Sequence, residues 1–285
     1  MTEASDGAHR APEHFGSDAE YVDTHVHLDE DAFAEDIGAV VDRADLLGVH
    51  RMVNIAYRPS RWASSALLKK TYPMISVAAG FHPGHSNEFT PTTVDELRTA
   101  IDQLDAVAIG EIGFDFFRPG YDAGLQERSF RAQVELATAL QLPVIIHQRS
   151  AEDDCVRVLA ETASDLDVVL HSFDGSWNLG RLGIDRGYYF GVGGLMTRGA
   201  AHLVREVLAE VPSDRILLET DAPYLTPNGV KTRRNEPANI PFIAQRLADL
   251  RGVSVTDIAR ATTANARRVF NLPDRPPSAN APGLT

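Results

Sequence analysis

The fold of this chain is constrained most strongly by an alternation of short β-rich runs with longer stretches of helical spacing. The predicted strands span residues 21–27, 51–56, 74–81, 106–111, 143–147, 167–171, 188–192 and 215–219. The predicted helices span residues 32–47, 60–71, 93–103, 124–140, 152–163, 177–186, 200–210, 237–251 and 256–269. Such a succession of strand–helix units is typical of a parallel sheet that closes on itself.

Several predicted strands are apolar on both faces, for example Val144-Ile145-Ile146 and Val168-Val169-Leu170. Such runs indicate parallel strands covered by helices. The length of 285 residues is close to the usual size of a (β/α)8 barrel, about 250 residues. We therefore predict an α/β fold, a single-domain TIM (β/α)8 barrel over residues 19–271. We expect a disordered N-terminal extension at 1–18 and a flexible C-terminal tail at 272–285.

Side chains that can bind a metal ion recur at the predicted ends of these strands. In a (β/α)8 barrel those ends, with the loops after them, form the open face that carries the active site. His25 and His27 are two residues apart on the first strand, so both imidazoles project from the same side. The full set comprises His25, His27, Glu111, His147, His171 and Asp221.

A metal centre explains this set better than the alternatives for its single members. One histidine after an apolar run is more often a hydrogen-bonded core residue, and an isolated His-x-His pair can be exposed surface. A catalytic ion commonly keeps three protein ligands and one open position. Four imidazoles and two carboxylates therefore predict two divalent ions, with Glu111 on the fourth strand bridging them.

Charge and composition limit the possible functions. The formal net charge of -13 repels polyanions, so nucleic-acid binding requires local basic groups. No apolar run approaches the roughly 20 residues of a membrane span, and the N-terminus lacks the pattern of a signal peptide. We expect a cytoplasmic protein that does not associate with membranes, and the sequence indicates no obligate protein partner.

The metal-capable residues lie in motifs that resemble those of the TatD family of metal-dependent hydrolases. The matching segments are 23–28, 79–83, 109–115, 143–149, 171–176, 219–225 and 235–237. The resemblance implies a TIM barrel of the amidohydrolase superfamily. It also implies a deoxyribonuclease, a 3'-5' exonuclease-like phosphodiesterase that uses a water molecule activated by two metal ions.

The resemblance also implies how the ligands are shared. One ion would be bound by His25, His27, Glu111 and Asp221, and the other by Glu111, His147 and His171. The sixth motif, which often reads His-Cys-Phe-Ser-Gly, differs here at Ser172 and Asp174. The added carboxylate near the mouth of the barrel would oppose a phosphate.

Catalytic roles are expected for Asp221 and His82 beside the bridging Glu111. Asp221 can both bind an ion and accept the proton of the attacking water, or it can act only as a ligand. His82, at the end of the third strand, can donate a hydrogen bond to a phosphoryl oxygen or protonate the leaving group. The alternative for His82 is to orient a metal ligand.

Phosphate binding requires positive charge on the same face. Arg149 is the best candidate, since a guanidinium matches a phosphate with two parallel hydrogen bonds. Arg233 and Arg234, after the eighth strand, are further candidates, and the alternative for both is solvated surface charge. Phe117 and Trp177 are candidates for stacking on bases, although aromatic side chains there are as often packing residues.

Two other functions remain open. The same barrel and ions suit hydrolysis of a small amide, lactone or phosphoester, and the acidic net charge favours such a substrate over DNA or a short oligonucleotide. A metal-binding barrel that serves only as an interaction platform is disfavoured, because every expected ligand is present. The ligand types admit zinc, manganese, nickel or iron, and magnesium less readily.

Overall fold

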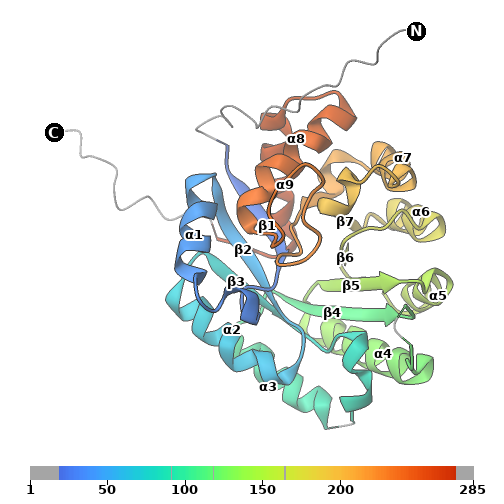
Figure 1. Ribbon diagram of the computed structural model, residues 1–285. Coiled ribbons are helices and arrows are strands. Elements are labelled where there is room, and N and C mark those ends of the chain that lie inside the picture. Colours follow the sequence, from blue (N-terminus) through green and yellow to red (C-terminus); the bar gives the residue numbers. More distant parts are fainter. Residues whose placement is uncertain (1–18, 91, 118, 164, 274–285) are drawn as a thin grey trace.

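A single sheet of eight parallel strands forms the centre of the molecule, and helices lie around its outside (Figure 1). The computed structural model describes residues 19–90, 92–117, 119–163 and 165–273. In sheet order the strands are β1 (Tyr21–Val26), β2 (Val49–Ala56), β3 (Ile75–Ala79), β4 (Ala108–Asp115), β5 (Val144–Arg149), β6 (Val168–Leu170), β7 (Tyr189–Val192) and β8 (Ile216–Leu218). The predicted extension at 1–18, and the predicted tail beyond residue 273, lie outside the described residues.

The first strand meets the segment that follows the last one. The His27 N–H donates to the Ala222 carbonyl at 2.8 Å, and the Asp221 N–H donates to the His25 carbonyl at 2.9 Å. Val26 and Ala222 form a parallel bridge between the same two segments. The sheet therefore curves into a barrel, and the predicted TIM (β/α)8 fold is confirmed.

The helices occupy the predicted positions. They are α1 (Ile37–Leu46), α2 (Pro59–Thr71), α3 (Thr93–Leu104), α4 (Ala123–Leu140), α5 (Glu152–Thr162), α6 (Trp177–Arg186), α7 (His202–Glu210), α8 (Ile240–Arg251) and α9 (Val255–Val269). Two of them begin later than predicted, because a 3-10 turn precedes each: η1 (Asp31–Phe33) comes before α1, and η5 (Pro237–Asn239) comes before α8. Within the described part of the chain, every helix is too short or too polar to cross a membrane.

Apolar side chains fill the inside of the barrel. Ile55, Ile145 and Leu217 come from three different strands and pack in one cluster with Val269 and Phe270 at the end of α9. The last helix thus covers the end of the barrel from which the strands start. The opposite end, where the strands finish, is left for the polar side chains.

The fourth strand is longer than predicted. The sequence placed its end at Glu111, but β4 continues to Asp115, so Glu111 lies within the strand. Gly113 lets the strand continue beside β5, because a Cβ at this position would lie 2.1 Å from the carbonyl oxygen of His147. The pairing of β4 with β5 shifts register at Glu111, and such a bulge re-aims the side chain of the extra residue.

Candidate metal centre

The first group of metal-capable side chains consists of His25 on β1, His27 directly after β1 and Asp221 after β8. His27 Nε2 lies 3.2 Å from Asp221 Oδ1, and His25 Nε2 lies 3.8 Å from the same oxygen. The pairing of β1 with β2 shifts register between Asp23 and Val26; His25 lies within this irregular stretch, and His27 follows directly after it. Asp221 has a φ of 57°, a conformation that non-glycine residues rarely adopt and that recurs at functional sites.

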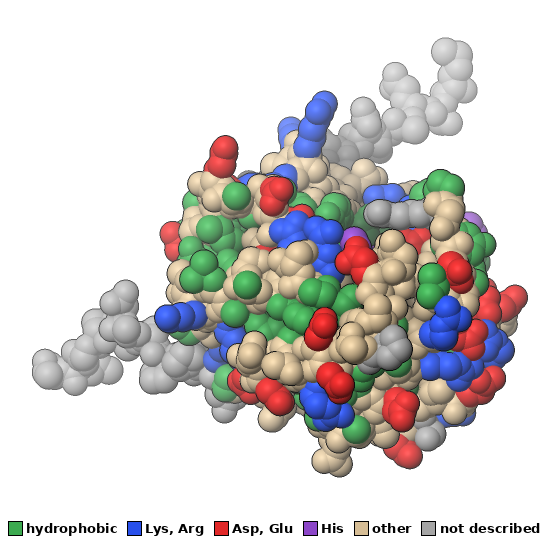
Figure 2. Space-filling model, turned by 90° about the horizontal axis from the view of Figure 1, so that it is seen from below, with side chains coloured by type: hydrophobic (Ala, Val, Ile, Leu, Met, Phe, Trp, Pro, Cys, Tyr) green, Lys and Arg blue, Asp and Glu red, His purple; other side chains and the backbone are tan. Residues whose placement is uncertain are grey.

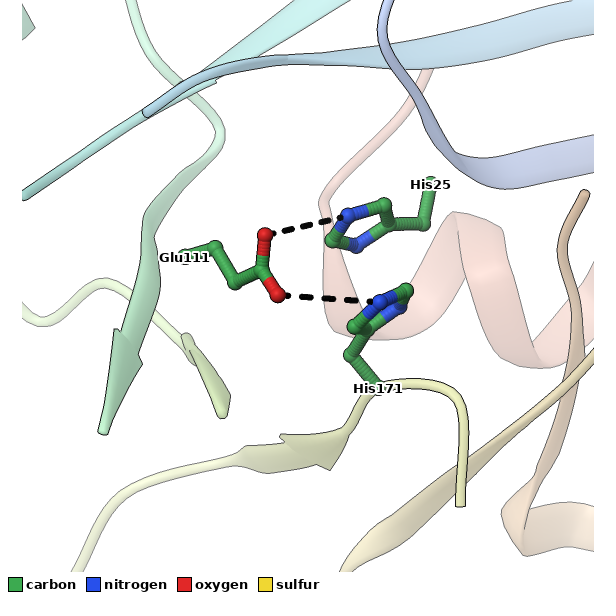
Figure 3. A group of neighbouring side chains, drawn as sticks. All are labelled: His25, Glu111 and His171. Carbon is green, nitrogen blue, oxygen red and sulfur yellow. Dashed lines mark ion pairs between the residues drawn. The ribbon is translucent and has the colours of Figure 1, made fainter. Parts of the chain in front are cut away.

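Glu111 connects this group to a second one. Its Oε2 lies 3.6 Å from His25 Nε2, and its Oε1 lies 3.6 Å from His171 Nε2 (Figure 3). The rings of His25 and His171 stack, with centroids 3.4 Å apart. These three side chains come from β1, from β4 and from just after β6, so only the barrel brings them together.

A third group contains Glu111 with His147 and His82. His147 Nδ1 lies 2.5 Å from Glu111 Oε1, and His82 Nε2 lies 4.0 Å from the same oxygen. The family resemblance pairs His147 with His171 instead. The ring centroids of those two residues are 6.5 Å apart, and a nitrogen of each ring faces Glu111 Oε1. The structure therefore brings all six predicted ligands into one connected cluster: Glu111 faces His25, His147 and His171, and Asp221 faces His25, His27 and His171, with His82 as an additional neighbour of Glu111.

A hydrogen bond within its own loop defines the tautomer of His82. The Gly84 N–H donates to His82 Nδ1 at 2.9 Å, so Nδ1 carries a lone pair. In a neutral imidazole the proton is then on Nε2, the atom that faces Glu111. Burial and the charge of His147 lower the pKa of His82 to about 3, which keeps the ring neutral. An Nε2–H group donates a hydrogen bond, so His82 is arranged as a donor and not as a metal ligand.

The ring nitrogens of His25 test whether this cluster fits a metal ion. Both are buried, and neither forms a hydrogen bond with any described residue. The 3.6 Å and 3.8 Å from Nε2 to Glu111 and Asp221 are too long for hydrogen bonds. Two ligand atoms that each lie about 2.1 Å from one ion are separated by roughly 3 to 4 Å. The spacing and the donor types therefore fit divalent cations.

Glu219 belongs to the site although the sequence analysis assigned it no role. Its Oε1 lies 2.9 Å from His171 Nδ1 and accepts a hydrogen bond of 2.6 Å from the Ser172 N–H. The buried carboxylate occupies the space that Gly191 leaves in β7, because a Cβ there would lie 2.2 Å from Glu219 Oε2. The sequence contains a signal for this role: Glu219 is the last residue of a predicted strand, where active-site residues are expected, and it lies two residues before Asp221.

Two more buried carboxylates support the backbone around the site. Asp23 accepts hydrogen bonds from the N–H of Thr220 at 2.9 Å and from its hydroxyl at 2.5 Å, which ties β1 to the end of β8. Asp115 accepts a hydrogen bond of 3.0 Å from the Phe117 N–H, and its Oδ2 lies 3.5 Å from His147 Nε2. Asp115 thus holds the loop after β4 and faces the ring of a predicted ligand.

The buried charges shift one another's pKa values. Burial raises the pKa of Glu111, but His147, His171 and another neighbouring histidine together hold it well below its ordinary value. Burial lowers the pKa of His147, but the nearby carboxylates of Glu111 and Asp115 raise it to about 9. Glu219 and Glu111 likewise outweigh burial and raise the pKa of His171 to about 10. Without a metal ion, protons on histidines therefore balance the carboxylates.

The basic residues predicted to bind phosphate lie in different surroundings. Arg149 is exposed, and its guanidinium lies 3.7 Å from the ring centre of Phe117, which is 61% exposed. Arg233 is exposed in the segment between β8 and α8. Acidic and basic side chains are interspersed on the face shown in Figure 2. On this face a substrate would therefore meet single basic side chains and not a continuous positive surface.

The guanidinium of Arg234 is already occupied by hydrogen bonds to other residues of the protein. Its two terminal nitrogens each donate to Asp36 at 2.7 Å, and they also reach Glu236 at 3.1 Å and the Ala32 carbonyl at 2.7 Å. These bonds tie the segment after β8 to the segment before α1. We therefore expect Arg234 to hold this loop in place, in contrast to the phosphate contact predicted from the sequence.

The acid that departs from the family's sixth motif is also hydrogen-bonded, both within its own loop and to β5. Asp174 accepts hydrogen bonds from the Gln148 amide at 2.9 Å, from the Ser176 N–H at 2.9 Å and from the Ser176 hydroxyl at 2.6 Å. These donors offset part of its negative charge. Its predicted repulsion of a phosphate is weakened accordingly.

The chain is similar to known proteins over almost all of the barrel. The family model described as TatD-related DNase matches residues 22–271. The uncharacterized metal-dependent hydrolase YabD of Bacillus subtilis is 33% identical, and the match covers 88% of this chain and 98% of that protein. The 3'-5' ssDNA/RNA exonuclease TatD of Salmonella typhimurium is 36% identical over 88% of this chain and 98% of its own length. The crystal structure of the TatD homologue YjjV from Escherichia coli has a TM-score of 0.83 at 32% identity, covering 89% of this chain and 98% of that one.

Proposed function

The chain belongs to the TatD-related DNase family of metal-dependent hydrolases, and on that premise we propose that it removes nucleotides from the 3' end of single-stranded DNA. The relative from Salmonella typhimurium is named for this polarity and for single-stranded nucleic acid. The observation that carries the proposal is the position of Glu111. Its two oxygens face different metal-capable groups, as a bridge between two ions requires.

Each ligand has a place in this proposal. We assign His25, His27 and Asp221 to one ion, His147 and His171 to the other, and Glu111 to both. Divalent ions in these positions supply Lewis acidity, which activates water and neutralises charge on a phosphodiester. Glu219 fixes the ring of His171, so that Nε2 of this histidine faces Glu111 while Nδ1 faces Glu219.

Asp221 and His82 handle protons in the proposed reaction. The side chain of Asp221 is 13% exposed, compared with 5% for Glu111, so water reaches it more easily. We assign Asp221 as the acceptor of the proton from the attacking water. His82 donates a hydrogen bond through Nε2 to the oxygen on which negative charge develops, and its link to Gly84 keeps that donor oriented.

The exposed guanidinium groups position the strand. Arg149 has the planar donors that match a phosphate, and its guanidinium stacks on the Phe117 ring, which helps to hold it in position. Arg233 offers a second exposed cation after β8. Phe117 and Trp177, which is 48% exposed, present apolar rings that can stack on bases.

The test is one substrate panel with added Mg²⁺, Mn²⁺ or Zn²⁺. It compares 5'-labelled single-stranded DNA with a free or a blocked 3' end, nucleotides, and small amides and lactones. We expect a ladder of shortened products from the free 3' end, no products with a chelator, and none from Glu111→Ala. Glu206→Ala removes a comparable but exposed carboxylate from α7 and serves as the matched control.

The panel also decides between the two candidate substrate classes. The net charge of -13 favours a small amide, lactone or phosphoester, and turnover confined to such compounds would displace the nuclease proposal. Full activity of a folded Glu111→Ala variant would refute the bridging role. Circular dichroism of that variant separates loss of the site from loss of the fold.

A further inference from the structure

Arg58 lies on the same rim of the barrel as the metal centre, although no motif in the sequence pointed to it. It follows β2 by two residues and stands directly before the first residue of α2. Its backbone is extended, with φ -163° and ψ 159°. The loops after the strands form the open face of such a barrel, so Arg58 belongs to that face.

The guanidinium of Arg58 is one aromatic ring away from the predicted ligands. Its Cζ lies 5.5 Å from the ring centre of Tyr57. The Tyr57 ring packs against His27, with ring centres 5.4 Å apart, and against His82, with ring centres 6.1 Å apart. The ring therefore supports the cation at the border of the site.

Arg58 also has an unused donor. Its Nε is buried and forms no hydrogen bond with any described residue. Arg61, one helical turn further, differs: its guanidinium pairs with Glu30 at 2.8 Å and donates to the Asp29 carbonyl. A buried donor without a partner costs free energy until a ligand satisfies it. The planar donors of an arginine match a phosphate group best.

The position of Arg58 around the barrel relates it to the exposed Arg149 and Arg233. Arg58 follows β2, Arg149 is the last residue of β5 and Arg233 follows β8; these strands are three, three and two strands apart in the closed order of the sheet. Arg58 and Arg149 thus stand on separate sides of the mouth with the metal centre between them. A single phosphate at the ions cannot reach both sides.

We propose that Arg58 binds a backbone phosphate of a single-stranded oligonucleotide, on the side of the metal centre opposite Arg149. The substrate class is therefore a strand with phosphates on both sides of the scissile bond, and not a mononucleotide or a phosphomonoester. This inference rests on the proposed nuclease function and specifies its substrate. Arg58 contributes affinity and position, whereas the chemistry stays with the metal centre.

The experiment compares Arg58→Gln with Arg186→Gln. Arg186 is exposed at the end of α6, at the opposite end of the barrel, so the control removes the same charge from a remote place. For each protein, kcat and KM are measured on a single-stranded oligonucleotide and on a dinucleotide over a series of NaCl concentrations. Melting curves verify that both variants are folded.

We expect Arg58→Gln to raise KM for the oligonucleotide about tenfold, the usual loss for a charged hydrogen bond, and to change kcat little. The slope of log(kcat/KM) against log[NaCl] should fall in magnitude by about 0.7, the value for one phosphate contact on a single strand. The preference for the oligonucleotide over the dinucleotide should fall with it. Arg58→Lys should restore the salt slope, because it keeps the charge.

The outcomes separate this inference from the function on which it rests. Wild-type protein without chelator-sensitive nuclease activity would overturn both. Nuclease activity in wild type, with the same KM and salt slope in Arg58→Gln as in Arg186→Gln, would overturn only the role of Arg58. If Arg58→Gln does not fold, Arg58→Met is measured in its place. A salt slope reduced by about 0.7 then supports the charge contact, and a slope equal to that of Arg186→Gln contradicts it.

Discussion

His171 lies between two buried carboxylates: its Nδ1 is 2.9 Å from Glu219 Oε1 and its Nε2 is 3.6 Å from Glu111 Oε1. The first carboxylate is enclosed by the barrel and the second faces the metal-capable cluster. Glu219 therefore orients the ring through Nδ1, which leaves Nε2 facing the cluster, where it can bind a metal ion.

Glu219→Gln should weaken the binding of the proposed ion at His171 by about 10- to 100-fold, the usual effect of losing a carboxylate behind a metal-binding histidine. Chelator competition measures the two affinities without reference to activity. Gly191→Ala should act in the same direction, because its Cβ would displace the Glu219 carboxylate. Glu206→Gln, on the exposed face of α7, is the control. Unchanged affinities in both Glu219→Gln and Gly191→Ala would remove Glu219 from the site.

Metal uptake should release protons at neutral pH. The pKa of His147 is raised to about 9 and that of His171 to about 10, mainly because neighbouring carboxylates outweigh burial. Both rings are therefore in the positively charged imidazolium form at pH 7.5, and each must lose one proton to bind an ion. Affinity should rise with pH until both groups are neutral. Titration calorimetry in two buffers of different ionisation enthalpy measures the released protons, and identical heats in both buffers would contradict this assignment.

Arg233 and Arg234 are neighbours in sequence with different expected roles. Arg234→Gln should lower the unfolding midpoint, because it removes the bonds to Asp36 and Glu236 that tie the loop after β8 to the segment before α1. Arg233→Gln should leave the midpoint near that of wild type and weaken oligonucleotide binding. Thermal melts and KM values of the two variants, measured side by side, check the contrast. The reverse pattern would return Arg234 to the phosphate-binding set.

The sequence allowed the fold to be predicted because its signals are local and repeat. Apolar runs, helical spacing and their alternation identify each unit of the barrel without knowledge of the others. The rule that strand ends share one face then brings together distant residues such as His25 and Asp221. The predicted end of the fourth strand was wrong, because the strand continues through Gly113, where the His147 backbone comes too close for any side chain. That contact joins two strands and leaves no local signal in the sequence.

The parts that could not be predicted depend on which side chains meet across the barrel. Glu219 is a support for His171 only because Gly191, on another strand, leaves room for it. The tautomer of His82 follows from a single hydrogen bond to Gly84. The periodicity of the sequence carries no information on such contacts. The motif that contains each residue indicated only that the residue lies near the site.

The central claim is that one carboxylate, Glu111, lies between two ions, and anomalous diffraction from crystals soaked in Mn²⁺ or Zn²⁺ tests it most directly. We expect two anomalous peaks about 3.5 to 4 Å apart. One should lie near His25, His27 and Asp221, the other near His147 and His171, with Glu111 in contact with both. Ions bound elsewhere, or a single ion that does not touch Glu111, would contradict the two-ion site.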